Sequence, residues 1–410
     1  MKKLFLAIIM LATGLIVTAC GGNANDQIVL EFFNLKPELN NILQEIADDF
    51  NYENPNIVIN ITGLSDAAIV LRSRMASNDA PDITHVWIEN NDYREWAADG
   101  RFLNLNEEAF LNNITAGVPE EFAINGNVYA VPLTMSMYGI WYNTTAFQEL
   151  GIAAPQTWQE MEQIVEQINR AGYIPFATSL STPAAGSING FHQLLWMTVA
   201  GGFAEAQELL IGSEIDGLTM DDPYLLQVAQ RLSLVANNSQ LNSAGASVPD
   251  AIASFSSGES LMLPGGSWNS PTIALQNPEF EVGMFPVPGE NRNEGLAIGA
   301  LDISLAISAD IPEERQEAAK KFIAYFTEVE TMQRVFEVDG DPVSVIGVET
   351  EFPDREGIAT LAFTDRQVPW LHSIWLTEEE FASLTVDFMN SGNLENFVSD
   401  INSFLNLMRD

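Results

Sequence analysis

The chain has 410 residues, of which 47% are hydrophobic and 10% aromatic, a length that suffices for two domains with well-buried cores. Its 56 acidic residues against 17 basic ones give a formal net charge of −39. A surface this acidic repels nucleic acid and anionic headgroups, so we expect no nucleic-acid partner. The single cysteine, Cys20, leaves no disulfide within the chain and no thiolate metal site.

The N-terminal segment, residues 1–19, is typical of a bacterial signal peptide. Two lysines precede an uncharged apolar stretch, residues 4–17, which is shorter than most membrane-spanning helices. It runs into Cys20 in a pattern that resembles the bacterial lipobox, whose cysteine is lipidated and becomes the first mature residue. Small polar residues then predict a lipidated tether over residues 20–26. We expect an exported protein anchored by lipid to the outer face of the cell membrane, or periplasmic if there is an outer membrane; a transmembrane anchor is the alternative.

Strand and helix patterns alternate beyond the tether. Short apolar or β-branched runs predict strands at residues 28–33, 57–61 and 82–88. Apolar residues at helical spacing predict helices at 37–50 and 66–77. This alternation predicts a parallel sheet with helices on its faces, and in such sheets the loops after the strand ends line the ligand crevice.

The pattern changes where a long extended stretch, residues 128–143, carries a proline near its start. Such a strand can run from one domain into another. A second proline-bearing extended stretch spans residues 280–289, and a further strand is predicted at 299–307. A helix begins near Pro312, and beyond residue 327 the chain is mostly helical.

These landmarks occur in an order that is found in one family. The residues that carry the likeness are the lipobox, Pro81–Ile83, Val128–Pro132, Trp141–Asn143, Phe147, Gly151, Pro155–Trp158, Phe255–Met262, Gly266–Trp268 and Phe285–Gly289. The ordered set covers nearly the whole mature chain and resembles the extracellular solute-binding proteins of ABC importers, the branch that includes maltose-binding protein.

The resemblance implies an α/β, two-lobe periplasmic-binding-protein type II fold with hinge-connected lobes and the ligand between them. The N-lobe would comprise residues 27–135 and 297–328, and the C-lobe residues 136–296 and 329–410. It also implies a substrate-binding subunit that captures a neutral mono- or oligosaccharide and delivers it to the permease subunits in the membrane. Closure about the hinges is the expected motion. No cofactor and no metal are implied.

The stretch around Trp268 fits the chemistry of a sugar site. An apolar run ends in a proline and two glycines, which let the chain turn so that Trp268 would project into the cleft. One face of a sugar ring is apolar and can stack on an indole, whereas the hydroxyls of its rim need polar partners. Core packing is the alternative for this tryptophan.

The other candidates lie in loops after predicted strands, beside the crossing stretch, or in the aromatic C-terminal segment. Under the resemblance, the ligand-binding residues are Asn34, Lys36, Glu89, Asn90, Ser136, Met137, Tyr138, Asn189, Phe191, Trp268, Asp302, Trp370 and Trp375. For Trp370 and Trp375 a place in the helix-packing core is the alternative, and in the loop of Glu89 and Asn90 a solvated helix cap at Asn91 or Asp92 is the alternative. The chain departs from the family's best-known members in having Gly299-Ala300 where two glycines are usual, and Asn34-Leu35-Lys36 without the Trp-rich segment that many relatives have there. These departures leave the identity of the sugar open.

Two other functions stay open. An exported glycosidase needs two carboxylates across the scissile bond, which so acidic a chain supplies by chance. However, no H-E-x-x-H, G-x-S-x-G, P-loop or Rossmann pattern occurs, so we expect no enzyme. The other function is binding a different solute, above all a cationic polyamine, which would suit the acidic charge. Ferric-iron binders usually offer paired tyrosines, and Tyr138 and Tyr142 are not an adjacent pair.

Overall fold

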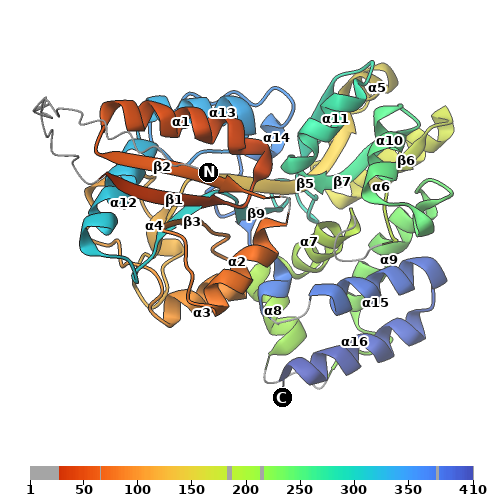
Figure 1. The fold of residues 1–410 in the computed structure, drawn as a ribbon. Coiled ribbons are helices and arrows are strands. Elements are labelled where there is room, and N and C mark those ends of the chain that lie inside the picture. Colours follow the sequence, from red (N-terminus) through yellow and green to blue (C-terminus); the bar gives the residue numbers. More distant parts are fainter. Residues whose placement is uncertain (1–26, 65, 182–186, 213–216, 375–377, 410) are drawn as a thin grey trace, which may run out of the picture.

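A computed structural model describes residues 27–64, 66–181, 187–212, 217–374 and 378–409. The chain forms two separate β-sheets with helices packed around each of them (Figure 1). The first has five strands in the order β2-β1-β3-β10-β4, and the second has six, in the order β11-β9-β5-β7-β6 with β8 beside β5. The strands of the first sheet are β1 (Ile28–Asn34), β2 (Ile57–Gly63), β3 (Ile83–His85), β4 (Ala130–Pro132) and β10 (Ser304–Ile307). Those of the second are β5 (Met135–Asn143), β6 (Ile174–Phe176), β7 (Ser260–Gly266), β8 (Val282–Phe285), β9 (Ala297–Leu301) and β11 (Gln367–Val368).

The helices divide between the two sheets. Around the first sheet lie α1 (Asn40–Glu53), α2 (Ala67–Ala76), α3 (Asn91–Ala98), α4 (Val118–Glu121), α12 (Glu313–Phe326) and α13 (Val329–Asp339) (Figure 1). Around the second lie α5 (Thr144–Leu150), α6 (Trp158–Ala171), α7 (Ile188–Ala200), α8 (Phe203–Ile211), α9 (Pro223–Asn237), α10 (Val248–Ser256), α11 (Ser270–Gln276), α14 (Glu356–Ala359), α15 (Glu378–Ser391) and α16 (Leu394–Arg409). Within the described ranges, no helix is both long and apolar enough to cross a membrane.

Each sheet has its own core on one face. Between β1 and the helices α1 and α12, Phe322 packs against Phe32 and Phe50 with ring centroids 6.0 and 5.1 Å apart. On the second sheet, the helices α7, α9, α15 and α16 enclose Trp196, which is fully buried. A third cluster includes Phe33 on the first sheet and Trp141 on the second, so apolar packing is continuous between the two sheets.

The chain passes between the sheets through segments that hydrogen-bond to one another. Thr134 joins β4 to β5, and its carbonyl accepts a 2.9 Å hydrogen bond from the N–H of Asp302, which joins β9 to β10. The stretch after α13 runs alongside, since Met135 N–H donates to the Pro342 carbonyl over 2.9 Å. The predicted continuous strands 128–143 and 299–307 are therefore each divided where the chain leaves one sheet for the other.

Two elements lie on the other side of the predicted lobe boundaries. Residues 297–328 were expected with the first lobe, but β9 pairs with β5 and β11 in the second sheet, so the passage comes at residue 302. Residues from 329 were expected with the second lobe, but α13 buries Met332 and Val335 in the core of the first sheet. Strand β9 belongs to the second sheet because it pairs in register with β5, and α13 belongs to the first because its apolar face packs there.

Candidate functional site

Three aromatic side chains meet at one edge of the second sheet because of the register of its strands. One row across this sheet consists of Val368, Ile298, Tyr138 and Gly266. Strands β7, β9 and β11 run in the same direction and end at this edge. Trp268 follows the row by two residues on one side and Trp370 by two residues on the other. Both indoles are thereby brought to the phenol ring of Tyr138.

The three rings form an aromatic cluster, by which we mean Tyr138, Trp268 and Trp370. The centroid of the Tyr138 ring lies 6.0 Å from that of Trp268 and 5.9 Å from that of Trp370, and the two indoles are 6.5 Å apart. Trp268 is 46% exposed, which is unusual for so large an apolar side chain. The cluster therefore offers an open aromatic surface above a buried base.

Backbone and polar contacts fix the cluster from below. The Tyr138 hydroxyl donates to the carbonyl of Ser187, and burial raises the pKa of this phenol above its ordinary value. The Tyr138 ring lies against Gly190 of α7, where a Cβ would come within 2.7 Å of it. On the other side, Trp141 Nε1 donates to the carbonyl of Gly266 over 3.0 Å. Tyr138 is thus a rigid support for the two indoles.

Polar side chains that the sequence analysis did not single out border the cluster. The His372 ring lies 5.4 Å from that of Trp370. Gln193 of α7 accepts from His372 N–H over 3.0 Å and lies 3.2 Å from His372 Nδ1. Gln193 also donates to Asn189, a predicted site residue, over 2.9 Å. His372 is two positions after the predicted site residue Trp370, and this proximity in the sequence could have suggested it as a site residue.

The segments from the first sheet contribute charged and polar groups. Asn34, at the end of β1, is 1% exposed and donates to Asn40 over 2.9 Å. Lys36 forms ion pairs with Asp302 and with Asp339, at 2.5 Å from the latter. His85 donates from Nε2 to the Asp302 carbonyl over 2.6 Å, because its Nδ1 accepts from a backbone N–H. Burial lowers the pKa of His85 to about 4, so this imidazole is neutral.

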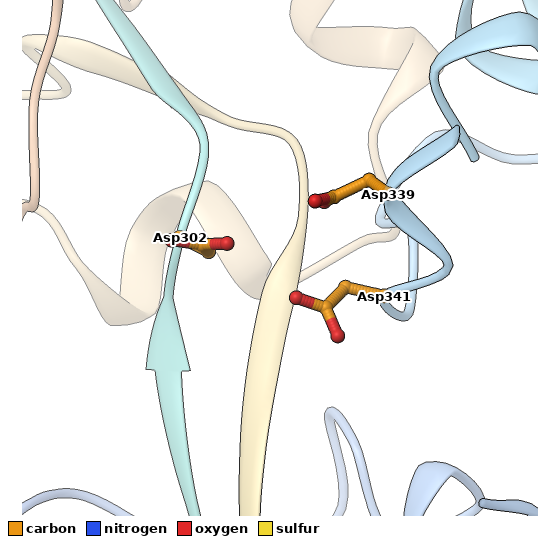
Figure 2. Close-up of side chains that lie close together, drawn as sticks. All are labelled: Asp302, Asp339 and Asp341. Carbon is orange, nitrogen blue, oxygen red and sulfur yellow. The ribbon is translucent and has the colours of Figure 1, made fainter. Parts of the chain in front are cut away.

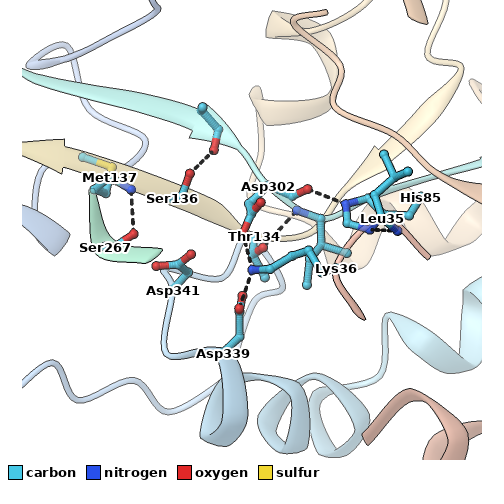
Figure 3. Close-up of polar contacts among 12 residues, drawn as sticks. Leu35, Lys36, His85, Thr134, Ser136, Met137, Ser267, Asp302, Asp339 and Asp341 are labelled. Atoms are coloured by element: carbon cyan, nitrogen blue, oxygen red, sulfur yellow. Dashed lines mark hydrogen bonds and ion pairs between the residues drawn. The ribbon is translucent and has the colours of Figure 1, made fainter. Parts of the chain in front are cut away.

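Three carboxylates converge beside the segments that join the sheets. Asp339, at the end of α13, and Asp341, two residues later, point toward Asp302, which joins β9 to β10 (Figure 2), and one oxygen of each lies within 4.8 Å of the others. Such a group could hold a metal ion, but the Lys36 ammonium already contacts two of its members (Figure 3). The arrangement among these side chains is a buried ion-pair network around one lysine.

The network shifts the pKa values of its members. Burial lowers the pKa of Lys36, but the nearby carboxylates outweigh this effect and raise it above its ordinary value. Burial, and then the neighbouring carboxylates, raises the pKa of Asp341 well above its usual range, and burial raises the pKa of Asp339 above its ordinary value. Lys36 therefore stays charged, whereas Asp339 and Asp341 ionise less readily than an exposed aspartate.

A cavity of about 490 Å³ lies between elements of the two sheets. Glu89, Arg94 and Phe122 line it from the first, and Phe203 and Pro369 from the second. The Glu89 carboxylate accepts from the N–H of Leu301 over 2.8 Å, and burial raises its pKa to about 7. Pro369, in the wall of this cavity, directly precedes Trp370 of the aromatic cluster in the chain.

The remaining predicted site residues have varied positions. Ser136 is buried, and its hydroxyl donates to the Ala300 carbonyl over 3.4 Å. Asn90 is exposed just ahead of α3 and lines a small pocket that also includes Trp96. Trp375 lies outside the described residues.

Met137 and Phe191 are placed differently from what we predicted. Their side chains are 1% and 0% exposed and belong to the third cluster and to the core of the second sheet. Alternation along β5 puts Met137 on the face opposite to Tyr138. Phe191 lies on a helix that is buried on nearly all sides. Neither side chain presents a surface to a ligand.

Comparisons with known proteins agree with this architecture. Residues 36–333 match the sequence profile of the bacterial extracellular solute-binding proteins. The chain is 36% identical over 416 residues to the multiple sugar-binding protein of Streptococcus mutans, covering 100% of this chain and 98% of that one. It is also similar to the solved apo form of RafE from Streptococcus pneumoniae, with a TM-score of 0.86 and 34% identity over 94% of this chain and 99% of that one. RafE in complex with raffinose gives a TM-score of 0.84 at 34% identity, covering 94% of this chain and 100% of that one.

The predicted family and fold class are confirmed by these comparisons. The two sheets with their surrounding helices form the type II periplasmic-binding-protein fold of the RafE structures. The profile match covers most of the chain, and the relative from Streptococcus mutans extends over all of it. The chain belongs to the bacterial extracellular solute-binding proteins, and hence to an exported family that binds sugars among other solutes.

Proposed function

We propose that this protein is the lipid-anchored, substrate-binding subunit of an ABC importer and that it captures a neutral oligosaccharide at the aromatic cluster. The observation that carries this proposal is the meeting of Tyr138, Trp268 and Trp370 at one sheet edge, with Trp268 46% exposed. An exposed indole in a fixed position is a flat apolar partner for the C–H face of a sugar ring. Gln193 and His372 stand beside it for the ring's hydroxyls.

The cavity lined by Glu89 favours an oligosaccharide as the ligand over a single sugar ring. Its volume of about 490 Å³ falls within the range of small-molecule pockets and comes in addition to the surface of the aromatic cluster. Phe122 and Phe203 face it from the two sheets, with Arg94 and Glu121 as polar groups at its wall. A sugar chain that begins on Trp268 would extend past Trp370 into this space.

The relatives favour the same class of ligand. One is named a multiple sugar-binding protein, and RafE has been solved with raffinose bound. The proposal has three further parts. The protein delivers the sugar to membrane permease subunits, its two lobes close about residues 133–134 and 302–303, and Cys20 carries a lipid. Cys20 lies outside the described residues, so mass spectrometry of the membrane-bound protein is the test for its lipid.

The experiment is a calorimetric titration of the purified chain, begun at residue 21, with raffinose, stachyose and melibiose. We expect saturable binding of at least one of them and none of spermidine, which tests the polyamine alternative. Trp268→Ala should weaken binding at least about 30-fold, the loss typical of a central tryptophan. Tyr52→Ala is the matched control, because Tyr52 is an aromatic residue that is 88% exposed on α1. Equal affinity of the Trp268→Ala variant and the control would refute this site.

The same mixtures test for catalysis. If the protein only binds, chromatography after prolonged incubation shows each oligosaccharide intact, with a raised Tm for those that bind. Release of smaller sugars in proportion to protein concentration would instead show a glycosidase.

A further inference from the structure

The turn that carries Trp268 is held on both sides by contacts that lead to one arginine. Before Trp268, Gly266 ends β7, and its carbonyl accepts from Trp141 Nε1 over 3.0 Å. After it, Ser270 begins α11, and its Oγ donates to the carboxylate of Asp354 over 2.9 Å. Trp141 and Asp354 are far apart in the sequence, but both contact the same guanidinium.

That guanidinium belongs to Arg355, which lies just ahead of α14. Its Nε and one terminal nitrogen donate to the two oxygens of Asp354, each over 3.0 Å, a bidentate geometry that fixes the orientation of both groups. Its central carbon lies 5.9 Å from the centre of the Trp141 ring, within the range of a cation–π contact. One side chain therefore stands behind both of the contacts that hold the Trp268 turn.

Arg355 is itself fixed in place. Its side chain is 8% exposed, and its other terminal nitrogen donates to Asp341 over 3.5 Å. A Cβ at Gly340 would stand 3.4 Å from the guanidinium, so the backbone there also lies close to it. Asp341 follows α13, which packs in the core of the first sheet. The arginine thereby joins the Trp268 turn, on the second sheet, to a segment anchored on the first.

The contacts of Arg355 depend on the shape of the guanidinium and not on its charge alone. A guanidinium is a planar fork that can donate to a carboxylate through two nitrogens while it also lies over an aromatic ring, whereas an ammonium is a compact point charge. Arg355→Lys therefore keeps the positive charge among the buried carboxylates and removes the fork. It separates an effect of geometry from an effect of charge.

We propose that Arg355 is a positioning residue for Trp268, which fixes the orientation of the indole from both sides of its turn without touching the ligand. Without the guanidinium, Trp141 and Asp354 each lose a group that orients them, and the indole loses its fixed place beside Tyr138. This inference rests on the proposed sugar site for its effect on binding, but not for its effect on the indole.

The first test measures the indole without ligand. The full mature chain is labelled with 5-fluorotryptophan, and each fluorine resonance is assigned by its loss when that tryptophan is replaced by phenylalanine. We expect R355K to shift the resonances of Trp141 and Trp268 and to leave that of Trp158, on α6, in place. R231K is the matched control, since Arg231 is also buried, ion-paired and 4.5 Å from the centre of a tryptophan ring, that of Trp158. It should shift the Trp158 resonance and leave that of Trp268 in place.

An unchanged Trp268 resonance in R355K would overturn the proposal, and so would an equal shift of this resonance in R231K. If R355K does not fold, D354N provides the answer. Asp354 is partly exposed, and the asparagine keeps its size but loses the second carboxylate oxygen that the fork requires. D354N should also shift the Trp268 resonance, and the absence of a shift in this variant would be the contrary result.

The second test separates positioning from a general structural role. With raffinose as the probe, R355K should raise Kd about three- to tenfold, the loss expected of one hydrogen bond. In a Trp268→Phe background, R355K should change Kd by less than about twofold, because the indole that Arg355 positions is gone. If R355K weakens binding by the same factor in both backgrounds, Arg355 acts by another route and the proposal fails.

The two tests also keep this inference apart from the proposed function. If wild-type protein binds no sugar, the sugar proposal fails, and the fluorine resonances still decide whether Arg355 positions Trp268. If raffinose binds and the Trp268 resonance does not respond to R355K, the positioning role fails and the sugar site stands.

Discussion

The indole of Trp268 lies against the backbone of Gly266, where an added Cβ would stand 2.3 Å from two carbons of the ring. Real Cβ atoms do not approach other atoms so closely, so a residue with a side chain at 266 would displace the indole. The glycine in the sequence is therefore explained by the close approach of an aromatic ring and not by an unusual backbone angle.

This relationship gives a first prediction. Gly266→Ala should move the indole away from Tyr138 and raise the Kd for raffinose about tenfold or more, since overpacking typically costs 1–3 kcal/mol. Gly245→Ala is the control, because nothing lies within 4 Å of a Cβ there. Calorimetry measures both, and equal affinities would contradict the placement of the ring.

The hydrogen bonds between Gln193 and His372 lead to a second prediction. Gln193→Ala removes both of them and the hydrogen bond to Asn189, so the free energy of unfolding should fall by about 1–3 kcal/mol. Trp370 is next to this segment, and raffinose binding should weaken with it. Urea unfolding measures the stability, with Gln44→Ala on the exposed face of α1 as control. A change within 0.5 kcal/mol, roughly that of a surface substitution, would be the contrary result.

A third prediction concerns the buried lysine. Lys36→Met leaves Asp302, Asp339 and Asp341 without their main counter-charge, which should reduce the free energy of unfolding by about 3–5 kcal/mol. The loss should shrink as the pH falls toward 3.8, the ordinary pKa of an aspartate, because protonation then removes the repulsion. Lys321→Met, at an exposed position of α12, should change stability little. Similar urea midpoints for the two variants would refute this account of the network.

Glu89 supplies a fourth prediction, on pH. Burial raises its pKa from 4.5 to about 7 in the folded chain, so the unfolded chain ionises first as the pH rises. Glu89 should therefore cost no stability below pH 4.5, an increasing amount between pH 4.5 and 7, and about 3 kcal/mol above pH 7. The free energy of unfolding is measured as a function of pH for the wild type and for Glu89→Gln, and the wild-type curve is subtracted. The subtraction cancels the contribution of neutral, buried His85, whose effect on stability has the opposite dependence on pH. A flat difference between pH 4.5 and 7 would contradict the raised pKa.

The sequence allowed correct predictions of the features that depend on the local pattern of residues. The helices predicted at residues 37–50 and 66–77 correspond to α1 and α2, and the strands predicted at residues 28–33 and 57–61 correspond to β1 and β2. Trp268 does stand exposed just after a strand, but the two glycines belong to β7, with Gly266 extended, and the chain turns at Ser267–Asn269.

The rest depended on contacts between distant parts of the chain. Nothing in the local pattern shows that β9 pairs with β5, and so the passage between sheets was placed too early. Asp339 contacts Lys36, and Asp341 joins the same carboxylate cluster, only because α13 packs on the first sheet. Phe191 is an aromatic residue on a helix that is buried on nearly all sides, so its sequence could not show which neighbours it would have.

The crystal structure of the mature chain with raffinose tests the central claim most directly. We expect one sugar ring lying flat against the Trp268 indole, with Tyr138 and Trp370 beside it and the chain of rings directed toward Glu89. Raffinose bound at another surface, with the Trp268 indole bare, would contradict the account.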